Sequence, residues 1–156
     1  MDLCNPKEIK ALLGRHGFRF SKQMGQNFLI QEWVPRQTAE ASGAAPGVGV
    51  LEIGPGIGPL TAQLARRGEK VVSVELDRTL LPILAETLSD YDNVEIVPGD
   101  ILKTDIAALC RERMPGLPVV ACANLPYNIT TPVRTRLIES GLFASITVMI
   151  QREGAL

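Results

Sequence analysis

The stretch from Val48 to Leu60, which reads V-G-V-L-E-I-G-P-G-I-G-P-L, decides the fold. An apolar run of the length of a buried strand ends at three glycines with a spacing of two, and a helical pattern begins directly after them. This predicts a strand, a tight turn and a helix. Glycines tolerate positive φ and let a ligand approach the main chain, while the start of a helix offers free N–H groups. We therefore expect the turn of Gly54, Gly56 and Gly58 to bind part of a nucleotide-like molecule.

Two common phosphate-binding motifs are excluded at this turn. The dinucleotide fingerprint G-x-G-x-x-G would need a glycine where the chain has Pro59, and no G-K-[ST] follows to form a P-loop. The pattern therefore favours a nucleoside without phosphates. Strand-turn-helix units with glycines also occur for packing alone, so the turn by itself leaves both interpretations open.

Apolar runs alternate with helical patterns along the rest of the chain. After the glycine turn, further strands are expected at about residues 70–76, 94–100, 119–123 and 146–150. Five strands that alternate with helices imply a parallel sheet with right-handed crossovers, in the order 3-2-1-4-5. We predict an α/β, Rossmann-like domain over residues 46–156, preceded by a helical and basic segment over residues 1–45.

Helical periodicity also predicts which side chains face the core. The helix expected over residues 32–42 would place Val34, Thr38 and Ala41 inward. A later helix that closes at Gly141 is indicated by Pro132, Val133, Leu137 and Ile138. The single tryptophan, Trp33, is expected in the core rather than on the surface as a platform for a base.

Composition limits the class of protein. At 156 residues and 46% hydrophobic content, the chain can form one domain with a sizeable core. Its formal net charge of −1 gives no overall sign of a polyanionic partner, so any surface for nucleic acid must be local. Three cysteines without metal-ligand spacing favour a reducing compartment and predict no metal site. Because the sequence shows no secretory signal and no apolar stretch of membrane-spanning length, we expect a cytoplasmic protein without a membrane partner.

The most basic segment of the chain runs from residue 7 to residue 22. Its five Lys and Arg residues and His16 are opposed by a single acid, Glu8. Such a segment is either an ordinary solvated face or an arm that contacts RNA phosphates. The candidate RNA-binding residues are Lys7, Lys10, Arg15, Arg19 and Lys22.

Four predicted strands end in a residue that could contact a ligand. These residues are Gly54, Glu75, Asp100 and Asn124. One acid at the end of a strand usually forms a turn or caps a helix. Because the carboxyl ends of parallel strands meet at one edge of the sheet, where such folds bind ligands, the four together predict a binding site. Glu75 lies 21 residues after Gly54, the distance at which a βαβ nucleotide site places an acid on ribose hydroxyls.

Four motifs give the chain a clear resemblance to the ribosomal RNA adenine dimethyltransferases. These enzymes use S-adenosyl-L-methionine to methylate the exocyclic amine of adenine in RNA. The similarity extends from about residue 20 to residue 153. The motifs, in the family's order, are G-Q-N-F-L at residues 25–29, E-I-G-P-G-I-G at residues 52–58, V-E-L-D at residues 74–77 and N-L-P-Y at residues 124–127.

The resemblance implies roles for individual residues toward S-adenosyl-L-methionine. Asn27 and Leu29 would close over the cofactor, Gly54 would approach its methionine part, Glu75 would bind the ribose diol, and Asp100 would accept from the adenine amine. Carboxylates suit the last two roles because they only accept, whereas a diol and an amine donate. The full set of implied cofactor-binding residues is Gln26, Asn27, Leu29, Gly54, Gly56, Glu75, Leu76, Asp100, Ile101 and Asn124.

The implied catalytic residues are Asn124, Leu125, Pro126 and Tyr127. The nitrogen lone pair of the target amine is delocalised into the adenine ring, and acceptors on its two hydrogens would favour a pyramidal nitrogen. The Asn124 side chain and a backbone carbonyl of Leu125 or Pro126 can accept these bonds, while Tyr127 can stack on the extruded base. Proximity and alignment would then supply most of the acceleration, without a strong general base.

The resemblance implies, as substrate, two adjacent adenines of small-subunit ribosomal RNA, and as partner a precursor of the small ribosomal subunit. One alternative is a large-subunit ribosomal RNA adenine methyltransferase that confers macrolide-type antibiotic resistance. Another is a ribosome-assembly or transcription factor that keeps the fold without the chemistry, against which Asn124 and Tyr127 argue.

Members of the resembled family continue past the fifth strand. They add further strands and a small helical RNA-binding domain, whereas this chain stops at Leu156. We therefore expect the N-terminal catalytic part only, able to bind the cofactor but with little or no methylation of RNA.

Overall fold

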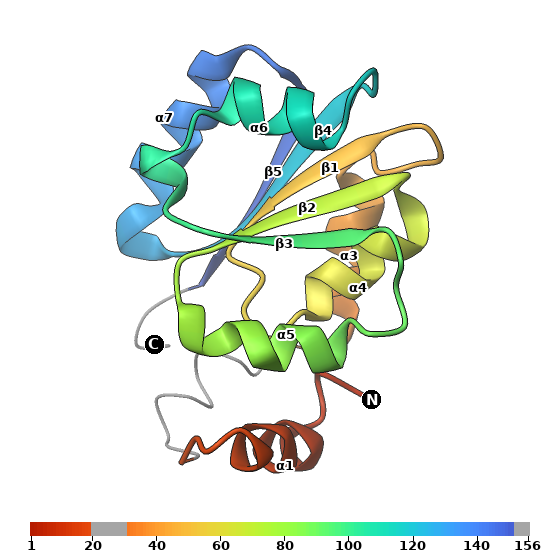
Figure 1. The fold of residues 1–156 in the computed structure, drawn as a ribbon, viewed down its shortest axis with the longest axis vertical. Coiled ribbons are helices and arrows are strands. Elements are labelled where there is room, and N and C mark those ends of the chain that lie inside the picture. The colour runs from red at the N-terminus through yellow and green to blue at the C-terminus, as the bar shows by residue number, and fades with distance from the viewer. Residues whose placement is uncertain (20–30, 152–156) are drawn as a thin grey trace.

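Five parallel strands form a single sheet in the order β3-β2-β1-β4-β5 (Figure 1). The structure is a computed structural model that describes residues 1–19 and 31–151. This order confirms the predicted α/β, Rossmann-like topology. The strands are β1 (Gly49–Ile53), β2 (Lys70–Glu75), β3 (Val94–Pro98), β4 (Val119–Pro126) and β5 (Phe143–Gln151).

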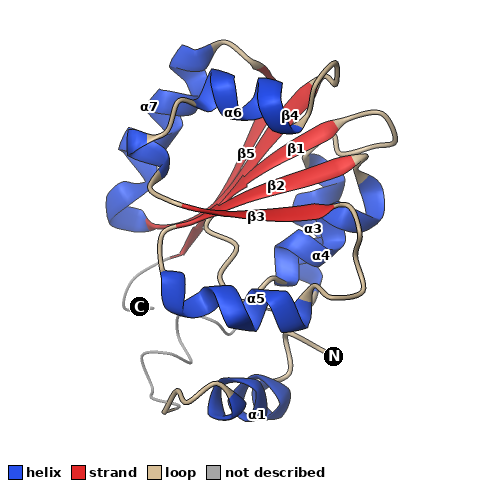
Figure 2. Cartoon of the chain, viewed as in Figure 1, coloured by secondary structure: helices blue, strands red, loops and turns tan. Residues whose placement is uncertain are grey.

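Helices cover both faces of the sheet, as the ribbon colours of Figure 2 make clear. Buried residues of α6 and α7 form one apolar cluster with the sheet, and those of α3 and α4 form another on its opposite face. None of the helices in the described part of the chain is long and apolar enough to cross a membrane. The helices are α1 (Pro6–Arg15), α3 (Trp33–Ala41), α4 (Pro59–Arg67), α5 (Leu81–Thr87), α6 (Ile106–Arg113) and α7 (Thr130–Ser140).

The central strand, β1, shows why the strands are continuous apolar runs in the sequence. Successive side chains of a strand point to opposite faces, so Val50 joins the cluster of α3 and α4, while Leu51 and Ile53 join that of α6 and α7. At the end of the strand, Ile53 pairs with Val74 of β2 and with Ala123 of β4. The carboxyl ends of three neighbouring strands therefore lie side by side at one edge.

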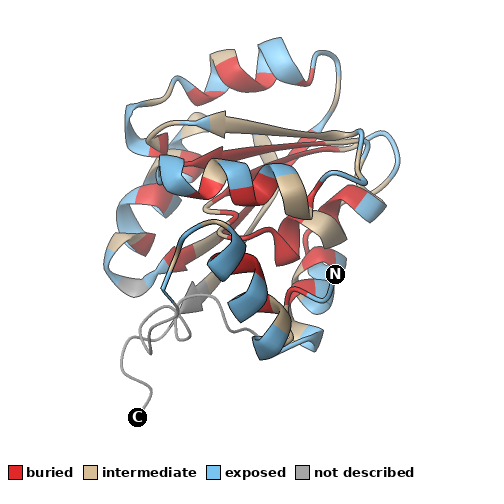
Figure 3. Ribbon diagram, turned by 60° about the horizontal axis from the view of Figure 1, so that its bottom comes forward, coloured by how far each residue is buried: buried red, intermediate tan, exposed pale blue. Residues whose placement is uncertain are grey.

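Helix α1 packs against α5 rather than against the sheet. Its first turn is capped by Asn5, whose side chain accepts the backbone N–H groups of Lys7 and Glu8. Ile9, Leu12 and Leu13 of α1 are buried in a cluster that includes residues of α5, and Figure 3 shows buried and exposed faces alternating along the helices. A domain boundary near residue 45 stays a prediction, but α1 shares its apolar core with the rest of the chain.

The predicted inward face of α3 is partly wrong. Ala41 is exposed, while Val34 and Thr38 are only half-buried. The buried positions are Pro35 and Ala39, which are one helical turn apart. Periodicity alone placed the buried stripe to one side of its true position, because small residues occur on both sides of this short helix.

Trp33, expected in the core, is on the surface, and so is Ile138 of the predicted helical pattern. Trp33 is 51% exposed and Ile138 is 59% exposed. Trp33 precedes the buried Pro35 by two positions, which is about 200° around a helix, so it points away from the core. Ile138 lies about 100° around α7 from the buried Leu137 and so falls outside the buried stripe.

We predict that Leu12→Ala lowers the free energy of unfolding by about 2–4 kcal/mol, because it leaves a cavity between α1 and α5. Leu12 is fully buried, so the chain should lose stability as one unit. Urea unfolding followed by circular dichroism measures the change. Lys10→Ala, on the exposed face of the same helix, is the control and should change stability by less than about 0.5 kcal/mol. A stability equal to that of the unsubstituted chain would show that α1 contributes nothing to the core.

Candidate cofactor-binding and active site

A cavity of about 520 Å³ opens at the carboxyl edge of the sheet. It lies among the glycine turn after β1 and the ends of β2, β3 and β4, which is where doubly wound sheets bind ligands. The predicted site residues that line this cavity are Gly54, Gly56, Glu75, Leu76, Asp100, Ile101, Asn124, Leu125 and Pro126. The structure therefore brings these residues together on one rim of the sheet.

The other predicted site residues cannot be placed at the cavity. Gln26, Asn27 and Leu29 lie outside the described residues, as does Lys22 of the basic segment. Tyr127 begins a short 3₁₀ turn that ends at Ile129, and its backbone follows β4 directly.

The glycine turn is held against the end of β4. Gly54 has a φ of +75°, and a Cβ added there would lie 2.7 Å from the backbone carbonyl oxygen of Asn124. A side chain at this position would therefore be strained and would also push the two strands apart. The turn ends at Gly58, which caps α4 in the left-handed conformation, with Pro59 as the first residue of the helix.

Glu75 connects the glycine turn to the end of β2. Its Oε1 accepts the backbone N–H of Gly56 at 3.2 Å, and its Oε2 accepts the backbone N–H of Asp77 at 2.8 Å. The side chain is buried, and this burial raises its pKa above the ordinary value, against the opposing effect of the two backbone donors. A carboxylate has about four acceptor positions, so Glu75 can still accept two more hydrogen bonds from a ligand.

At the end of β3, Asp100 also accepts a backbone N–H and keeps an acceptor oxygen for a ligand. Its Oδ1 accepts the backbone N–H of Leu102 at 2.9 Å and so caps the 3₁₀ turn that follows the strand. The cap uses only Oδ1 of Asp100, so Oδ2 stays available to a ligand. Beside it, the buried Ile101 and the 66% exposed Leu76 give the cavity apolar walls.

Asn124 is still part of β4, which continues to Pro126 instead of ending near residue 123 as predicted. The longer strand pairs with β5, where Asn124 lies opposite Met149. Within the described residues, the buried side-chain oxygen of Asn124 has no hydrogen-bond partner. The carbonyl of Pro126 accepts the hydroxyl of Thr130 at 3.0 Å. The strand thus presents an unused acceptor at the cavity.

Sequence reasoning missed two kinds of residue at this site. Ile129 and Val133, at the start of α7, line the cavity with apolar side chains. Their pattern is that of any amphipathic helix, so the sequence carries no signal for this role. Glu52, by contrast, stands inside the glycine motif and was given no role, although an acid in an apolar strand is itself a signal.

Glu52 is a fully buried acid below the glycine turn. Its Oε1 accepts the hydroxyls of Thr61 in α4 and Ser73 in β2 at 2.5 and 2.7 Å, and its Oε2 has no partner among the described residues. The pKa of Glu52 is raised from the ordinary 4.5 to about 7, chiefly by burial and in smaller part by the nearby charge of Glu75, while the two hydroxyls oppose this rise. The residue joins the strand before the turn to the helix after it.

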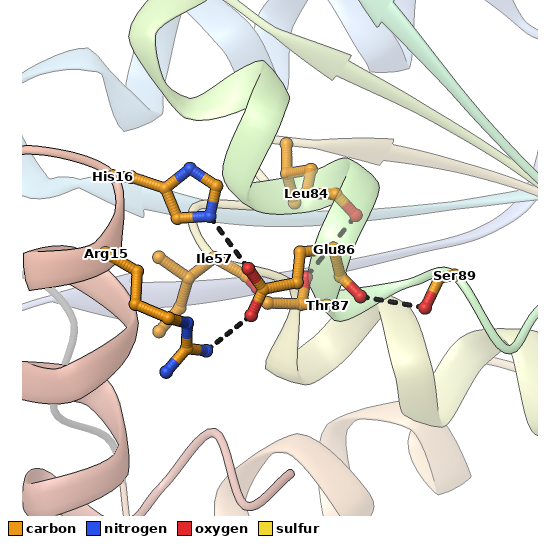
Figure 4. A network of polar contacts seen from close by, with 7 residues as sticks. All are labelled: Arg15, His16, Ile57, Leu84, Glu86, Thr87 and Ser89. Atoms are coloured by element: carbon orange, nitrogen blue, oxygen red, sulfur yellow. Dashed lines mark hydrogen bonds and ion pairs between the residues drawn. The ribbon is translucent and has the colours of Figure 1, made fainter.

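The basic segment is partly engaged within the chain. Arg15 and His16 both contact the carboxylate of Glu86 in α5, at 2.5 and 3.0 Å (Figure 4). Lys7, Lys10 and Arg19 are exposed. The segment therefore attaches α1 to α5 and leaves other cations free to meet solvent or a polyanion.

The sheet order and the cavity define the class of Rossmann-like methyltransferase folds. Solved structures of this class superpose on the chain. The 23S rRNA methyltransferase ErmE has a TM-score of 0.68 and 31% identity, over 80% of this chain and 48% of that protein. An RNA methyltransferase from Salinibacter ruber, solved with S-adenosyl-L-homocysteine, has a TM-score of 0.58 and 21% identity, over 70% of this chain and 69% of that protein.

The chain belongs to the ribosomal RNA adenine dimethylase family, whose model matches residues 17–156. One relative, the ribosomal RNA small subunit methyltransferase A of Streptococcus pneumoniae, is 49% identical over 99% of this chain and 54% of its own length. The chain thus spans about half the length of the curated relatives that it matches. The family membership confirms the resemblance stated from the four motifs.

We predict that Glu52→Gln makes stability less dependent on pH. Between pH 4.5 and about 7 the folded chain keeps a proton on Glu52 that the unfolded chain releases, so rising pH favours unfolding. The unsubstituted chain should therefore lose about 3 kcal/mol of its free energy of unfolding by pH 8, whereas the variant with the neutral glutamine should not. Urea unfolding at pH 5, 6, 7 and 8 measures the difference between the two proteins. The free energy of unfolding of the glutamine variant should rise relative to that of the unsubstituted chain as pH rises. A difference that stays constant with pH would show that the pKa of Glu52 is not raised in the folded chain.

Proposed function

We propose that this chain forms the cofactor-binding and catalytic part of an enzyme that dimethylates two adjacent adenines of small-subunit ribosomal RNA, with S-adenosyl-L-methionine as methyl donor. The observation that carries the proposal is the unpartnered, buried oxygen of Asn124 beside the glycine turn. An orphaned acceptor in a folded protein is costly unless a ligand donates to it. The exocyclic amine of adenine is such a donor.

The residues around the cavity fit this cofactor by their chemistry. The free lone pairs of Glu75 suit the two hydroxyls of a ribose, and the free oxygen of Asp100 suits the amine of the cofactor's adenine. Leu76 and Ile101 line the cavity and would offer apolar surface to that adenine. Gly54 and Gly56 let the methionine part approach the main chain. The cofactor supplies an electrophilic methyl group on a sulfonium.

The N-L-P-Y tetrad would hold the target base. The Asn124 side-chain oxygen accepts one hydrogen of the amine, and the backbone carbonyl of Leu125 or Pro126 accepts the other, so that the lone pair faces the methyl group. Tyr127 offers a ring on which the extruded base stacks. The methylated nitrogen is acidic and loses its proton to solvent, so orientation replaces a general base.

Small-subunit RNA is favoured over large-subunit RNA by the comparisons. The relatives named as small-subunit methyltransferases are 42–49% identical over nearly the whole chain. ErmE, named as a 23S rRNA enzyme, is 31% identical.

We predict that the chain binds S-adenosyl-L-methionine and that Glu75→Gln weakens this binding about tenfold or more, because a charge-assisted acceptor is lost. Isothermal titration calorimetry measures both affinities. Glu69→Gln is the matched control, since Glu69 also accepts a backbone N–H, that of Gly47, but lies away from the cavity. Equal losses in the two variants would argue against a ribose-binding role for Glu75.

We predict that Asn124→Ala lowers methyl transfer about 100-fold or more, as the loss of one transition-state hydrogen bond does elsewhere. Cofactor affinity should change little by comparison. Because this chain alone is expected to methylate RNA little or not at all, the assay uses a chimera in which it replaces the matching half of the Streptococcus pneumoniae relative. It follows labelled methyl groups into under-methylated small subunits under single-turnover conditions, with protein in excess. An equal loss of binding and transfer would contradict the assigned role, and transfer to large subunits alone would favour the alternative substrate.

A further inference from the structure

The last turn of α5 touches the glycine turn from outside the cavity. The hydroxyl of Thr87 donates to the backbone carbonyl of Ile57 at 2.8 Å (Figure 4). Ile57 lines the cavity, whereas Thr87 does not. Thr87 thus has no access to a ligand, but it holds a carbonyl of the segment that would touch one.

The contact leaves the glycine turn little room to move. A Cβ added to Gly58 would lie 3.1 Å from the Thr87 hydroxyl oxygen and 3.2 Å from the side chain of Leu88. Inside the turn, the N–H of Gly58 donates to the carbonyl of Pro55 at 2.9 Å. The turn is therefore fixed by its own hydrogen bond, by Glu75 on the β2 side and by Thr87 on the α5 side.

The residue before Thr87 fixes the same helical turn to α1. Glu86 contacts Arg15 and His16, which follow one another at the end of α1 (Figure 4). The hydroxyl of Ser89 donates to the Glu86 carbonyl at 3.0 Å and closes the end of α5. The basic segment and the glycine turn are thus connected through two successive residues, Glu86 and Thr87.

We propose that Thr87 is a positioning residue for the cofactor site, and that Glu86 steadies it by attaching the end of α5 to the basic segment. The inference rests on the proposed function for the identity of the ligand. Without the Thr87 hydroxyl, the Ile57 carbonyl loses a partner and the turn can adopt conformations that do not fit the cofactor. Binding then becomes weaker because only part of the population is competent.

Isothermal titration calorimetry with S-adenosyl-L-methionine tests the proposal on the 156-residue chain. Thr87→Val keeps the shape of the side chain and removes the hydrogen bond, so affinity should fall about two- to tenfold. Thr87→Ser restores the hydroxyl and should bind within about twofold of the unsubstituted chain. Thr38→Val is the matched control, because the Thr38 hydroxyl also donates to a carbonyl, that of Val34 at 2.7 Å, away from the cavity.

The outcomes separate the inference from the proposed function. If the unsubstituted chain does not bind the cofactor, the proposed function fails. If it binds and Thr87→Val binds equally well, or if Thr87→Ser is as weak as Thr87→Val, the positioning role is overturned. A loss in Thr38→Val as large as that in Thr87→Val would also overturn it, because general destabilisation would then explain both.

The contribution of Glu86 is tested by salt. Glu86→Gln should lower cofactor affinity at low ionic strength, and the difference should disappear at about 1 M salt, where exposed ion pairs are screened. The effect of Thr87→Val should persist at both ionic strengths, because its hydrogen bond is not an ion pair. An affinity of Glu86→Gln equal to that of the unsubstituted chain at low salt would remove Glu86 from the proposal.

Discussion

The structure depends on the close approach of Gly54 to the backbone carbonyl of Asn124. A single added carbon atom at Gly54 would lie 2.7 Å from that oxygen, so only glycine permits the contact. The two residues belong to the ends of adjacent parallel strands, whose register is fixed by the pairing of Ile53 with Ala123. In the proposed enzyme, the cofactor-binding turn and the residue that grips the target base are therefore positioned by the backbone itself, which costs no reorganisation during the reaction.

The same edge of the sheet also has to accommodate two acids. Glu52 lies fully buried below the glycine turn, and the charge of the buried Glu75 opposes the ionisation of Glu52. A pKa of about 7 keeps Glu52 half-protonated near neutrality, while Glu75 receives two backbone N–H groups that favour its charged form. In the proposed site, Glu52 supports the turn and Glu75 accepts hydrogen bonds from the ligand.

The chain before the sheet is part of this arrangement. Helix α1 buries its apolar face in a cluster with α5. At the end of α1, Arg15 and His16 contact Glu86 of α5. The next residue, Thr87, contacts the glycine turn. The described part of a segment that resembles a separate basic arm in the sequence is thus packed behind the proposed cofactor site, while its cations Lys7, Lys10 and Arg19 are exposed.

The sequence by itself determined the sheet order and most of the residues around the cavity. Local periodicity marks the strands, and parallel strands necessarily bring Glu75, Asp100 and Asn124 to one edge. Only the tertiary structure decided which side of a short helix is buried, as the exposed Trp33 illustrates, because neighbouring elements set that choice. It also decided that Thr87 contacts the glycine turn, since a hydroxyl in a helix gives no sign in the sequence of which distant carbonyl it meets.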